Sequence, residues 1–276
     1  MRTLDKFGNA SVGVDVWSKH LKTFGLGEFM GYDLPTGRRG NIPNSKTYKK
    51  IYPGWRWSSK TIVSNAIGQG EVLMTPIQLA NMMATVANRG YYYTPHIIKK
   101  IKGEVIDKKF RTKHVTTINK EHFETMVSGL FDVYNFGTAS GLRVEGIDIC
   151  GKTGTAENFT IIDGKRVQLK DHSIFVAFAP KDNPKIAIAI LVENGGYGAT
   201  IAGPIASLML EKYIRGKITR KDLETRILAR DLRPEYNRYI KNPVNDTLIN
   251  VTKTNTLLKP AAKDSSAANK SAASQG

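Results

Sequence analysis

Apolar residues recur at helical spacing in four stretches of the chain, and each stretch predicts an amphipathic helix. The first stretch covers residues 14–24, and Gly25 follows it as a natural helix stop. The second begins at Thr75 and Pro76, a hydroxyl cap followed by a first-turn proline, and it ends at Gly90. The two remaining predicted helices cover residues 120–134 and 199–214.

Continuous apolar runs in the second half of the chain predict β-strands. Residues 173–180 and 185–193 form two such runs, which a short Asp-Asn-Pro turn joins, and residues 147–149 begin a third. Three sequential strands with short connections predict an antiparallel sheet, and their apolar character indicates that helices cover it. The expected fold class is therefore α+β. Residues 91–101 are rich in aromatic and β-branched residues and predict a further strand, interrupted by Pro95.

Glycine and proline are frequent in residues 25–57, which predicts a long ordered loop region. The chain as a whole is expected to have three parts. Residues 1–216 form the main domain, residues 217–250 form a charged helical extension, and residues 251–276 form a disordered tail rich in alanine, serine and lysine.

The chain is strongly basic, because 41 lysines and arginines against 24 aspartates and glutamates give its 276 residues a formal net charge of +17. Such a charge favours acidic partners in general, but the positive residues are spread out, which favours a solvated surface over a nucleic-acid site. No apolar stretch is long enough to span a membrane, and residues 1–8 lack the apolar core of a signal peptide. The single Cys150 excludes an internal disulfide, and the isolated histidines indicate no metal site.

The segment that carries the candidate chemistry, residues 146–158, fits two patterns. Gly146, four further residues and Gly151-Lys152-Thr153 match the phosphate-binding loop of nucleotide hydrolases. That loop needs a helix that begins near the lysine, so that free N–H groups face the phosphates. The residues on both sides of Lys152 have strand character instead, which argues against a P-loop nucleotide hydrolase but keeps it as an alternative.

The second pattern is Lys152-Thr153-Gly154, the K-T-G element of penicillin-recognising serine acyltransferases. On an edge strand, Lys152 supplies positive potential, and the hydroxyls of Thr153 and Thr155 donate hydrogen bonds to a substrate carboxylate. Gly154 lets the substrate backbone lie close to the strand, and the N–H of Thr155 can serve in an oxyanion hole. We therefore assign substrate binding to Lys152, Thr153, Gly154 and Thr155, and a supporting catalytic role to Lys152 and Thr155.

Other segments extend this pattern over roughly residues 5–215. They are IGQG at residues 67–70, TPIQLA at residues 75–80, ANRG at residues 87–90 and FVAFAP at residues 175–180. Together with GKTGTAEN, they resemble the C-terminal part of the transpeptidase domain of class B penicillin-binding proteins, in particular the elongation-type penicillin-binding protein 2 group. A β-lactamase or β-lactam sensor shares the K-T-G element, but the first two segments argue against it.

The resemblance implies the fold shared by penicillin-binding transpeptidases and serine β-lactamases. It also implies the activity of a peptidoglycan D,D-transpeptidase, which cross-links stem peptides through an acyl-serine intermediate and reacts with β-lactams. It implies no metal and no organic cofactor. For the complete protein we expect a glycosyltransferase or elongation-complex partner at the periplasmic face of the inner membrane, and no nucleic acid.

Two elements of the family pattern are missing from this sequence. No serine has a lysine three residues later, as the S-x-x-K element requires for the nucleophile and its base. Thr47 and Lys50 have this spacing, but they fall in the predicted loop region, where we expect no helix start. No S-x-N occurs either, and Thr117-Ile118-Asn119 is its nearest form. We therefore predict an N-terminally incomplete domain that cannot acylate alone, and a non-catalytic basic binding module is the other alternative.

Overall fold

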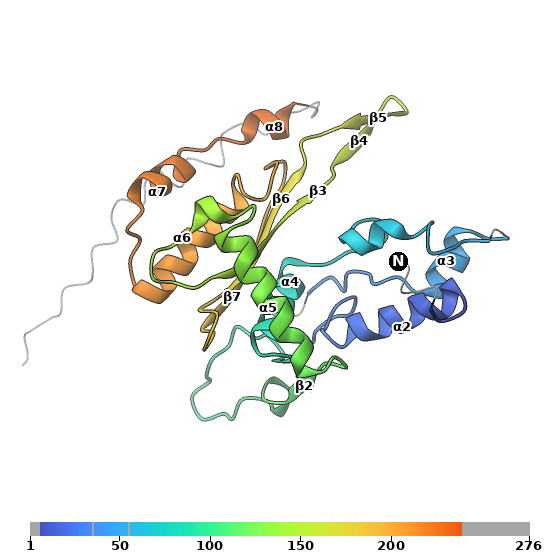
Figure 1. The fold of residues 1–276 in the computed structure, drawn as a ribbon, viewed down its shortest axis with the longest axis horizontal. Helices are drawn as coiled ribbons and strands as arrows, with labels where there is room; N and C mark the ends of the chain where they lie inside the picture. Colours follow the sequence, from blue (N-terminus) through green and yellow to red (C-terminus); the bar gives the residue numbers. More distant parts are fainter. Residues whose placement is uncertain (1–5, 35, 55, 239–276) are drawn as a thin grey trace, which may run out of the picture. The chain divides into compact units, whose positions relative to one another are not determined.

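A three-stranded antiparallel sheet forms the framework of the molecule. The computed structural model describes residues 6–34, 36–54 and 56–238 (Figure 1). Contacts divide the chain into the units Met1–Glu235 and Tyr236–Gly276, and the sheet with its covering helices belongs to the first unit. In the spatial order β3–β6–β7, the strands are β3 Cys150–Ala156, β6 His172–Ala179 and β7 Ile186–Val192.

The sheet confirms the α+β fold class and the strands expected from the apolar runs. β6 is the central strand and pairs with β3 on one side and with β7 on the other. The first strand begins at Cys150 instead of residue 147. The reason is that Gly146 turns the chain with a φ of +67°, and Val144 forms an isolated bridge with Ile147 just before the strand.

Helices cover both faces of this sheet. α4 Pro76–Ala87 and α5 Lys120–Asn135 pack on one face, and α6 Ala202–Arg215 packs on the other (Figure 1). Alternate residues of β6 point to opposite faces, as in any strand. Phe178 belongs to the apolar cluster under α4 and α5, whereas Phe175 belongs to the cluster under α6, and both side chains are fully buried. The hydrophobic core of the sheet therefore has two layers.

The region of residues 25–57, expected to be a loop, contains a helix, α3 Ser45–Ile51. Asn44 caps it: the Asn44 side chain accepts from the N–H of Thr47 at 3.1 Å, and the Thr47 hydroxyl accepts from the N–H of Asn44 at 3.2 Å. This reciprocal capping box outweighs the glycines and prolines nearby. The expectation that no helix starts near Thr47 and Lys50 is therefore wrong.

Short elements surround the central sheet and its helices. The helical ones are α2 Ala10–Lys22, α7 Lys221–Leu228, α8 Arg233–Asn237 and the 3₁₀ turns Val63–Ile67, Lys108–Phe110 and Ser140–Leu142. The strands are β1 Tyr91–Tyr93, β2 Lys113–Val115, β4 Phe159–Ile162 and β5 Lys165–Gln168. α7 and α8 fall within the predicted extension, whose boundaries at residues 217 and 250 stay a prediction. The predicted tail, residues 251–276, lies outside the described residues.

The strand expected over residues 91–101 is correct only for β1, where Tyr91 pairs with Val115 of β2. Beyond β1 the backbone has other partners. Pro95 has no N–H to give to a ladder. The N–H groups of Ile97 and Ile98 donate to the carboxylate of Asp33, at 2.9 and 2.7 Å. The side chain of Asp33, more than sixty residues earlier, thus takes the place of a neighbouring strand for Ile97 and Ile98.

The first turn of α4 joins several backbone segments. Thr75 caps the helix and forms a capping box with Gln78, whose Oε1 accepts from the N–H of Thr75 at 3.0 Å. The two N–H groups of the Gln78 amide are shared among three carbonyl oxygens, which lie 3.3 Å (Gly25), 2.9 Å (Glu28) and 3.0 Å (Arg39) from the amide nitrogen. Gln78 is buried, and these carbonyl groups satisfy the hydrogen-bonding capacity of its amide. The TPIQ segment therefore has a structural role.

Candidate functional site

The K-T-G segment lies within β3, at the edge of the central sheet. Among the described residues, β3 has β6 as its only neighbour in this sheet, so its other edge is free. Lys152 is exposed, and its Nζ donates to the carbonyl oxygen of Thr153 at 2.8 Å. An open strand edge presents unpaired N–H and C=O groups to which an extended peptide can bind as a further strand.

The register of β3 against β6 divides the polar side chains between the two faces of the sheet. Lys152 lies opposite Val176, which belongs to the cluster under α4 and α5. Thr153 lies opposite Phe175, on the α6 face, and Thr155 shares that face because strand side chains alternate. The lysine and the two hydroxyls can therefore approach one ligand only at the free edge of β3. The sequence predicted the residues but not this division.

Thr138 is a neighbour of the site that the sequence analysis missed. It lies between α5 and the 3₁₀ turn Ser140–Leu142, and its hydroxyl oxygen is 3.0 Å from that of Thr153. The two hydroxyl groups share one hydrogen bond, in which either can be the donor. The Thr153 hydroxyl can therefore still donate to a ligand, or accept from one. The only sequence signal was a threonine in a glycine-rich turn after a helix.

A glycine-rich loop between β7 and α6 packs against the same part of β3. A methyl group at Gly198 would lie 2.4 Å from the carbonyl oxygen of Ile174 and 2.6 Å from that of Gly154, so only glycine fits. Ser173 holds the loop: its hydroxyl donates to the carbonyl oxygen of Tyr197 at 2.9 Å and accepts from the N–H of Ala202 at 3.2 Å. The sequence signal was the Gly-Gly-x-Gly run at residues 195–198, which was not used.

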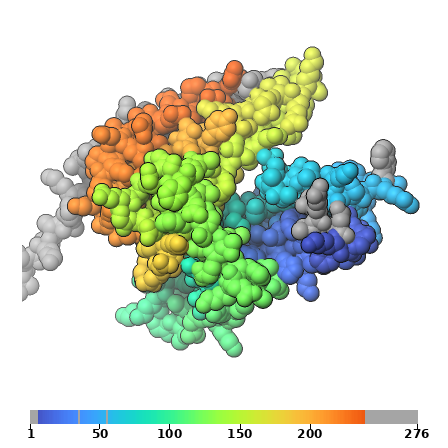
Figure 2. All heavy atoms as spheres, viewed as in Figure 1, coloured from blue at the N-terminus to red at the C-terminus, as the bar shows by residue number. Residues whose placement is uncertain are grey.

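The hairpin β4–β5 continues from the end of β3 through a turn at Asp163 and Gly164, both with positive φ, which is typical of an Asp-Gly hairpin turn. The space-filling view shows the hairpin projecting over an open notch, with the cyan segment before α4 on the other side (Figure 2). Asn158 anchors the hairpin base, because its amide nitrogen donates to Asn194 Oδ1 at 2.7 Å.

The geometry contradicts the phosphate-binding loop. Lys152 lies in the middle of a strand paired with β6, and the next element along the chain is the strand β4, not a helix. Without a helix start at the lysine, the free N–H groups that hold phosphates in such loops are missing.

Other candidate groups have no catalytic geometry. Burial raises the pKa of the Cys150 thiol to about 12, so this side chain stays neutral and inert at physiological pH. Thr117, the nearest counterpart of an S-x-N serine, is 2.6 Å from Nδ1 of His20, at the end of α2. The described part of the chain contains no cluster of three or more metal-ligating side chains. It also contains no helix long and apolar enough to cross a membrane.

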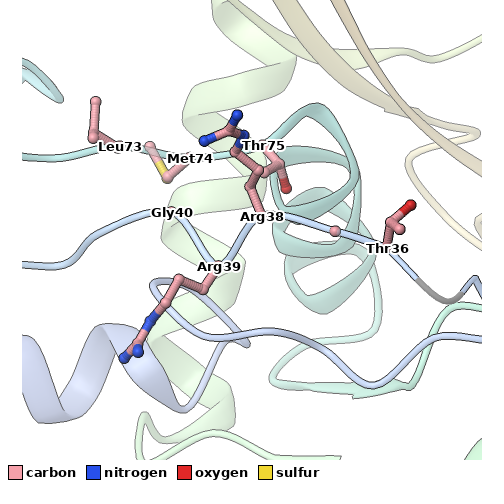
Figure 3. A pocket seen from close by; sticks show the side chains of 8 residues that line it. Thr36, Arg38, Arg39, Gly40, Leu73, Met74 and Thr75 are labelled. Atoms are coloured by element: carbon pink, nitrogen blue, oxygen red, sulfur yellow. The ribbon is translucent and has the colours of Figure 1, made fainter.

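A wide hollow lies apart from the K-T-G strand. It has a volume of about 840 Å³ and lies between two antiparallel segments, residues 36–40 and 73–75 (Figure 3). Arg38 and Arg39 extend from the first segment in different directions, and Leu73 and Met74 form an apolar wall (Figure 3). None of the four K-T-G site residues lines it, so the candidate site is defined by the strand edge and not by this hollow.

Comparison with known proteins gives one consistent result. Residues 5–211 match the penicillin-binding protein transpeptidase domain family. The peptidoglycan D,D-transpeptidase MrdA of Acinetobacter baumannii is 35% identical over 204 residues, which cover 69% of this chain and 30% of that protein. The chain thus spans about a third of the length of such relatives.

Two solved structures extend this result to the fold. Penicillin-binding protein 2 of Pseudomonas aeruginosa, in complex with WCK 5153, superposes with a TM-score of 0.61 at 27% identity, covering 75% of this chain and 44% of that chain. Penicillin-binding protein 2 of Helicobacter pylori, in its complex with MreC, gives a TM-score of 0.58 at 29% identity, covering 74% and 36%. Neither a nucleotide hydrolase nor a separate basic binding module finds support among these relatives.

Proposed function

Because this chain belongs to the family of penicillin-binding protein transpeptidase domains, we propose that it forms the substrate-holding, C-terminal part of a peptidoglycan D,D-transpeptidase. One observation carries the proposal. The residues Lys152, Thr153, Gly154 and Thr155 lie on a strand whose outer edge is free, where an extended peptide can add to the sheet.

In this proposal the D-alanyl-D-alanine end of a stem peptide lies along β3. The hydroxyls of Thr153 and Thr155 donate hydrogen bonds to its terminal carboxylate, and Lys152 supplies positive potential at the strand edge. The Lys152 ammonium group is available for this because its only partner in the described residues is a neutral carbonyl oxygen, that of Thr153. The N–H of Thr155 then donates to the oxygen of the tetrahedral intermediate.

The acyl transfer itself needs a serine nucleophile and a lysine base. The serine oxygen attacks the penultimate D-alanine carbonyl, the terminal D-alanine leaves as an amine, and an amine of a second stem peptide then takes the acyl group from the serine. No serine in this sequence has a lysine three residues later. We therefore expect the isolated chain to bind substrate at β3 without becoming acylated.

Partners and location follow from the same proposal. The Helicobacter pylori relative was solved as a complex with MreC, which supports an assembly of cell-wall elongation proteins around the complete protein. We propose that the complete protein works there with a glycosyltransferase, at the periplasmic face of the inner membrane, on stem peptides and β-lactams.

A pair of peptides tests the binding mode. The isotope-labelled 276-residue chain is titrated with a peptide ending in D-Ala-D-Ala and with the same peptide carrying a C-terminal amide. We expect the peptide with the free carboxylate to shift the backbone N–H signals of residues 153–155. The peptide with the C-terminal amide should leave these signals in place. Lys152→Met should weaken the effect of the free carboxylate, whereas Lys165→Met, on exposed strand β5, should not. Equal shifts from both peptides, or shifts that avoid β3, would contradict the proposal.

Labelling with a fluorescent penicillin tests the missing nucleophile separately. We expect no covalent label on the isolated chain after denaturing electrophoresis. A labelled serine within residues 1–276, located by mass spectrometry, would show that this chain contains its own nucleophile and that our interpretation of the sequence is wrong.

A further inference from the structure

The connection between β1 and β2 combines positive charge with exposed apolar side chains. We call residues 97–112 the β1–β2 loop. It contains six lysines and arginines against two acidic residues, a net charge of +4 in sixteen positions. In Figure 1 this loop projects from the molecule at the end opposite the β4–β5 hairpin.

Four apolar side chains of this loop face solvent within nine positions. Ile97 is 72% exposed and Val105 is 79% exposed, and Ile98 and Ile101 are nearly half exposed. Single exposed apolar residues are ordinary on protein surfaces, but a group of them on one loop marks an interaction surface. The lysines at positions 99, 100 and 102 alternate with these apolar residues and are themselves exposed.

The exposure of these side chains is built into the fold. The carboxylate of Asp33 accepts hydrogen bonds from the N–H groups of both Ile97 and Ile98, which fixes the start of the loop. These bonds also lower the pKa of Asp33, so the carboxylate stays charged at neutral pH. A hollow of about 190 Å³ lies within the loop, and Ile98, Ile101 and Val105 line it in part. The loop is therefore held open, and Ile97, which does not line this hollow, presents most of its side chain to solvent.

We propose that the β1–β2 loop binds the surface of an anionic lipid bilayer. The lysine ammonium groups would contact lipid phosphates, while Ile97 and Val105 would enter the region between headgroups and acyl chains. Charge complementarity favours this occupant, because the loop has a net charge of +4. A soluble polyanion would neutralise the lysines but would leave the two most exposed apolar side chains in water. The contact is peripheral, and it leaves the β3 edge open.

Vesicle sedimentation of the 276-residue chain tests the electrostatic half of the proposal. We expect binding to vesicles of phosphatidylcholine mixed with phosphatidylglycerol, weak binding to phosphatidylcholine alone, and loss of binding as salt is raised. The triple variant Lys99→Gln, Lys100→Gln, Lys102→Gln should partition roughly a hundredfold more weakly, because each lysine near the surface contributes about fivefold.

A matched variant separates the contribution of the loop lysines to binding from that of the protein's overall charge. The triple variant Lys46→Gln, Lys49→Gln, Lys50→Gln removes the same charge from exposed positions in α3. We expect it to retain binding within about threefold, because exposed charges beyond a Debye length act weakly. Equal losses in both triple variants would mean that the general charge of the protein drives binding, and this would overturn the proposal.

A second pair of variants tests the apolar half. Ile97→Ser should weaken binding to the mixed vesicles about tenfold, because the apolar side chain that would enter the bilayer is replaced by a polar one. Ile67→Ser, at a position that is 74% exposed outside the loop, should leave binding unchanged. If Ile97→Ser binds as wild type, the loop is a polyanion site, and if no vesicle is bound at all, a protein partner becomes the better occupant. Either result overturns the proposal, and neither depends on the stem-peptide experiment.

Discussion

Replacing Glu211 by glutamine tests the charged cluster that joins α6 to α7. The Glu211 side chain is 0% exposed. Its carboxylate accepts hydrogen bonds from the N–H of Thr219 at 2.9 Å and from Nε of Arg220 at 3.0 Å, and Nη1 of Arg215 lies 3.7 Å away. Glutamine keeps the shape of the side chain but removes its charge, so Arg220 loses the only carboxylate that it contacts among the described residues.

The expected loss follows from the burial of the pair. Removing one partner of a buried ion pair costs about 3–5 kcal/mol, because the other charge is left uncompensated. The Arg220 side chain is 23% exposed and still donates to the carbonyl oxygen of Leu142 at 3.1 Å. We therefore expect the lower end, about 3 kcal/mol, which is a large share of the roughly 5–15 kcal/mol that stabilises a typical domain.

Urea unfolding followed by circular dichroism measures this loss. Glu224→Gln is the matched control. It removes the same charge, but from an ion pair with the exposed Lys221, whose Nζ lies 2.7 Å from the Glu224 carboxylate. We expect the control to change the free energy of unfolding by less than about 0.5 kcal/mol. Equal losses for the two variants would refute the argument from burial.

The dependence on pH gives an independent check. Burial alone raises the pKa of Glu211, but hydrogen bonds from Thr219 and Arg220 outweigh it and hold the pKa below its ordinary value of 4.5. A carboxyl group with a lower pKa in the folded state stabilises fully above its unfolded pKa, and this stabilisation is lost as pH falls through the folded pKa. The gap between wild type and Glu211→Gln should therefore be constant near neutral pH and narrow below pH 4.5. A gap that widens in acid would contradict this.

Other substitutions test the site and the fold. Gly198→Ala should destabilise the chain by about 1–3 kcal/mol in thermal unfolding, since the new methyl group overlaps backbone oxygens of β3 and β6; an unchanged melting temperature would show that the loop moves freely. Thr138→Val should cost only about 1 kcal/mol but weaken the NMR response to the D-Ala-D-Ala peptide, because Thr153 loses its hydroxyl partner. Asn44→Ala should lower stability by about 1 kcal/mol by removing the cap of α3, and a loss near zero in urea unfolding would count against the cap. Cys150 should resist thiol reagents in the native chain and react fully only in denaturant, because burial raises its pKa to about 12.

The sequence was sufficient where a local pattern decides the structure. β6 and β7 followed from their apolar runs, and α4 followed from its threonine cap and first-turn proline. α3 could also have been found, because Asn44 and Thr47 are three residues apart, as in any capping box. The abundance of glycine and proline around it concealed this signal.

The remaining features depend on contacts between distant parts of the chain. Asp33 replaces the strand partner of residues 97 and 98, and nothing near those residues indicates it. Thr138 and Gly198 approach β3 from two different connections, so their place in the site needed the three-dimensional arrangement. The K-T-G residues could be listed from the sequence, but their distribution over two faces followed only from the register with β6.

The amide of Gln78 has a consequence for anyone who builds hybrids between this chain and its relatives. One side-chain amide contacts three carbonyl groups, those of Gly25, Glu28 and Arg39, which belong to the connection between α2 and α3. That segment and the first turn of α4 should therefore be exchanged together in a hybrid protein. A crossover placed between residues 40 and 75 would separate a donor from acceptors shaped for it, whereas one placed after α4 would transfer both together.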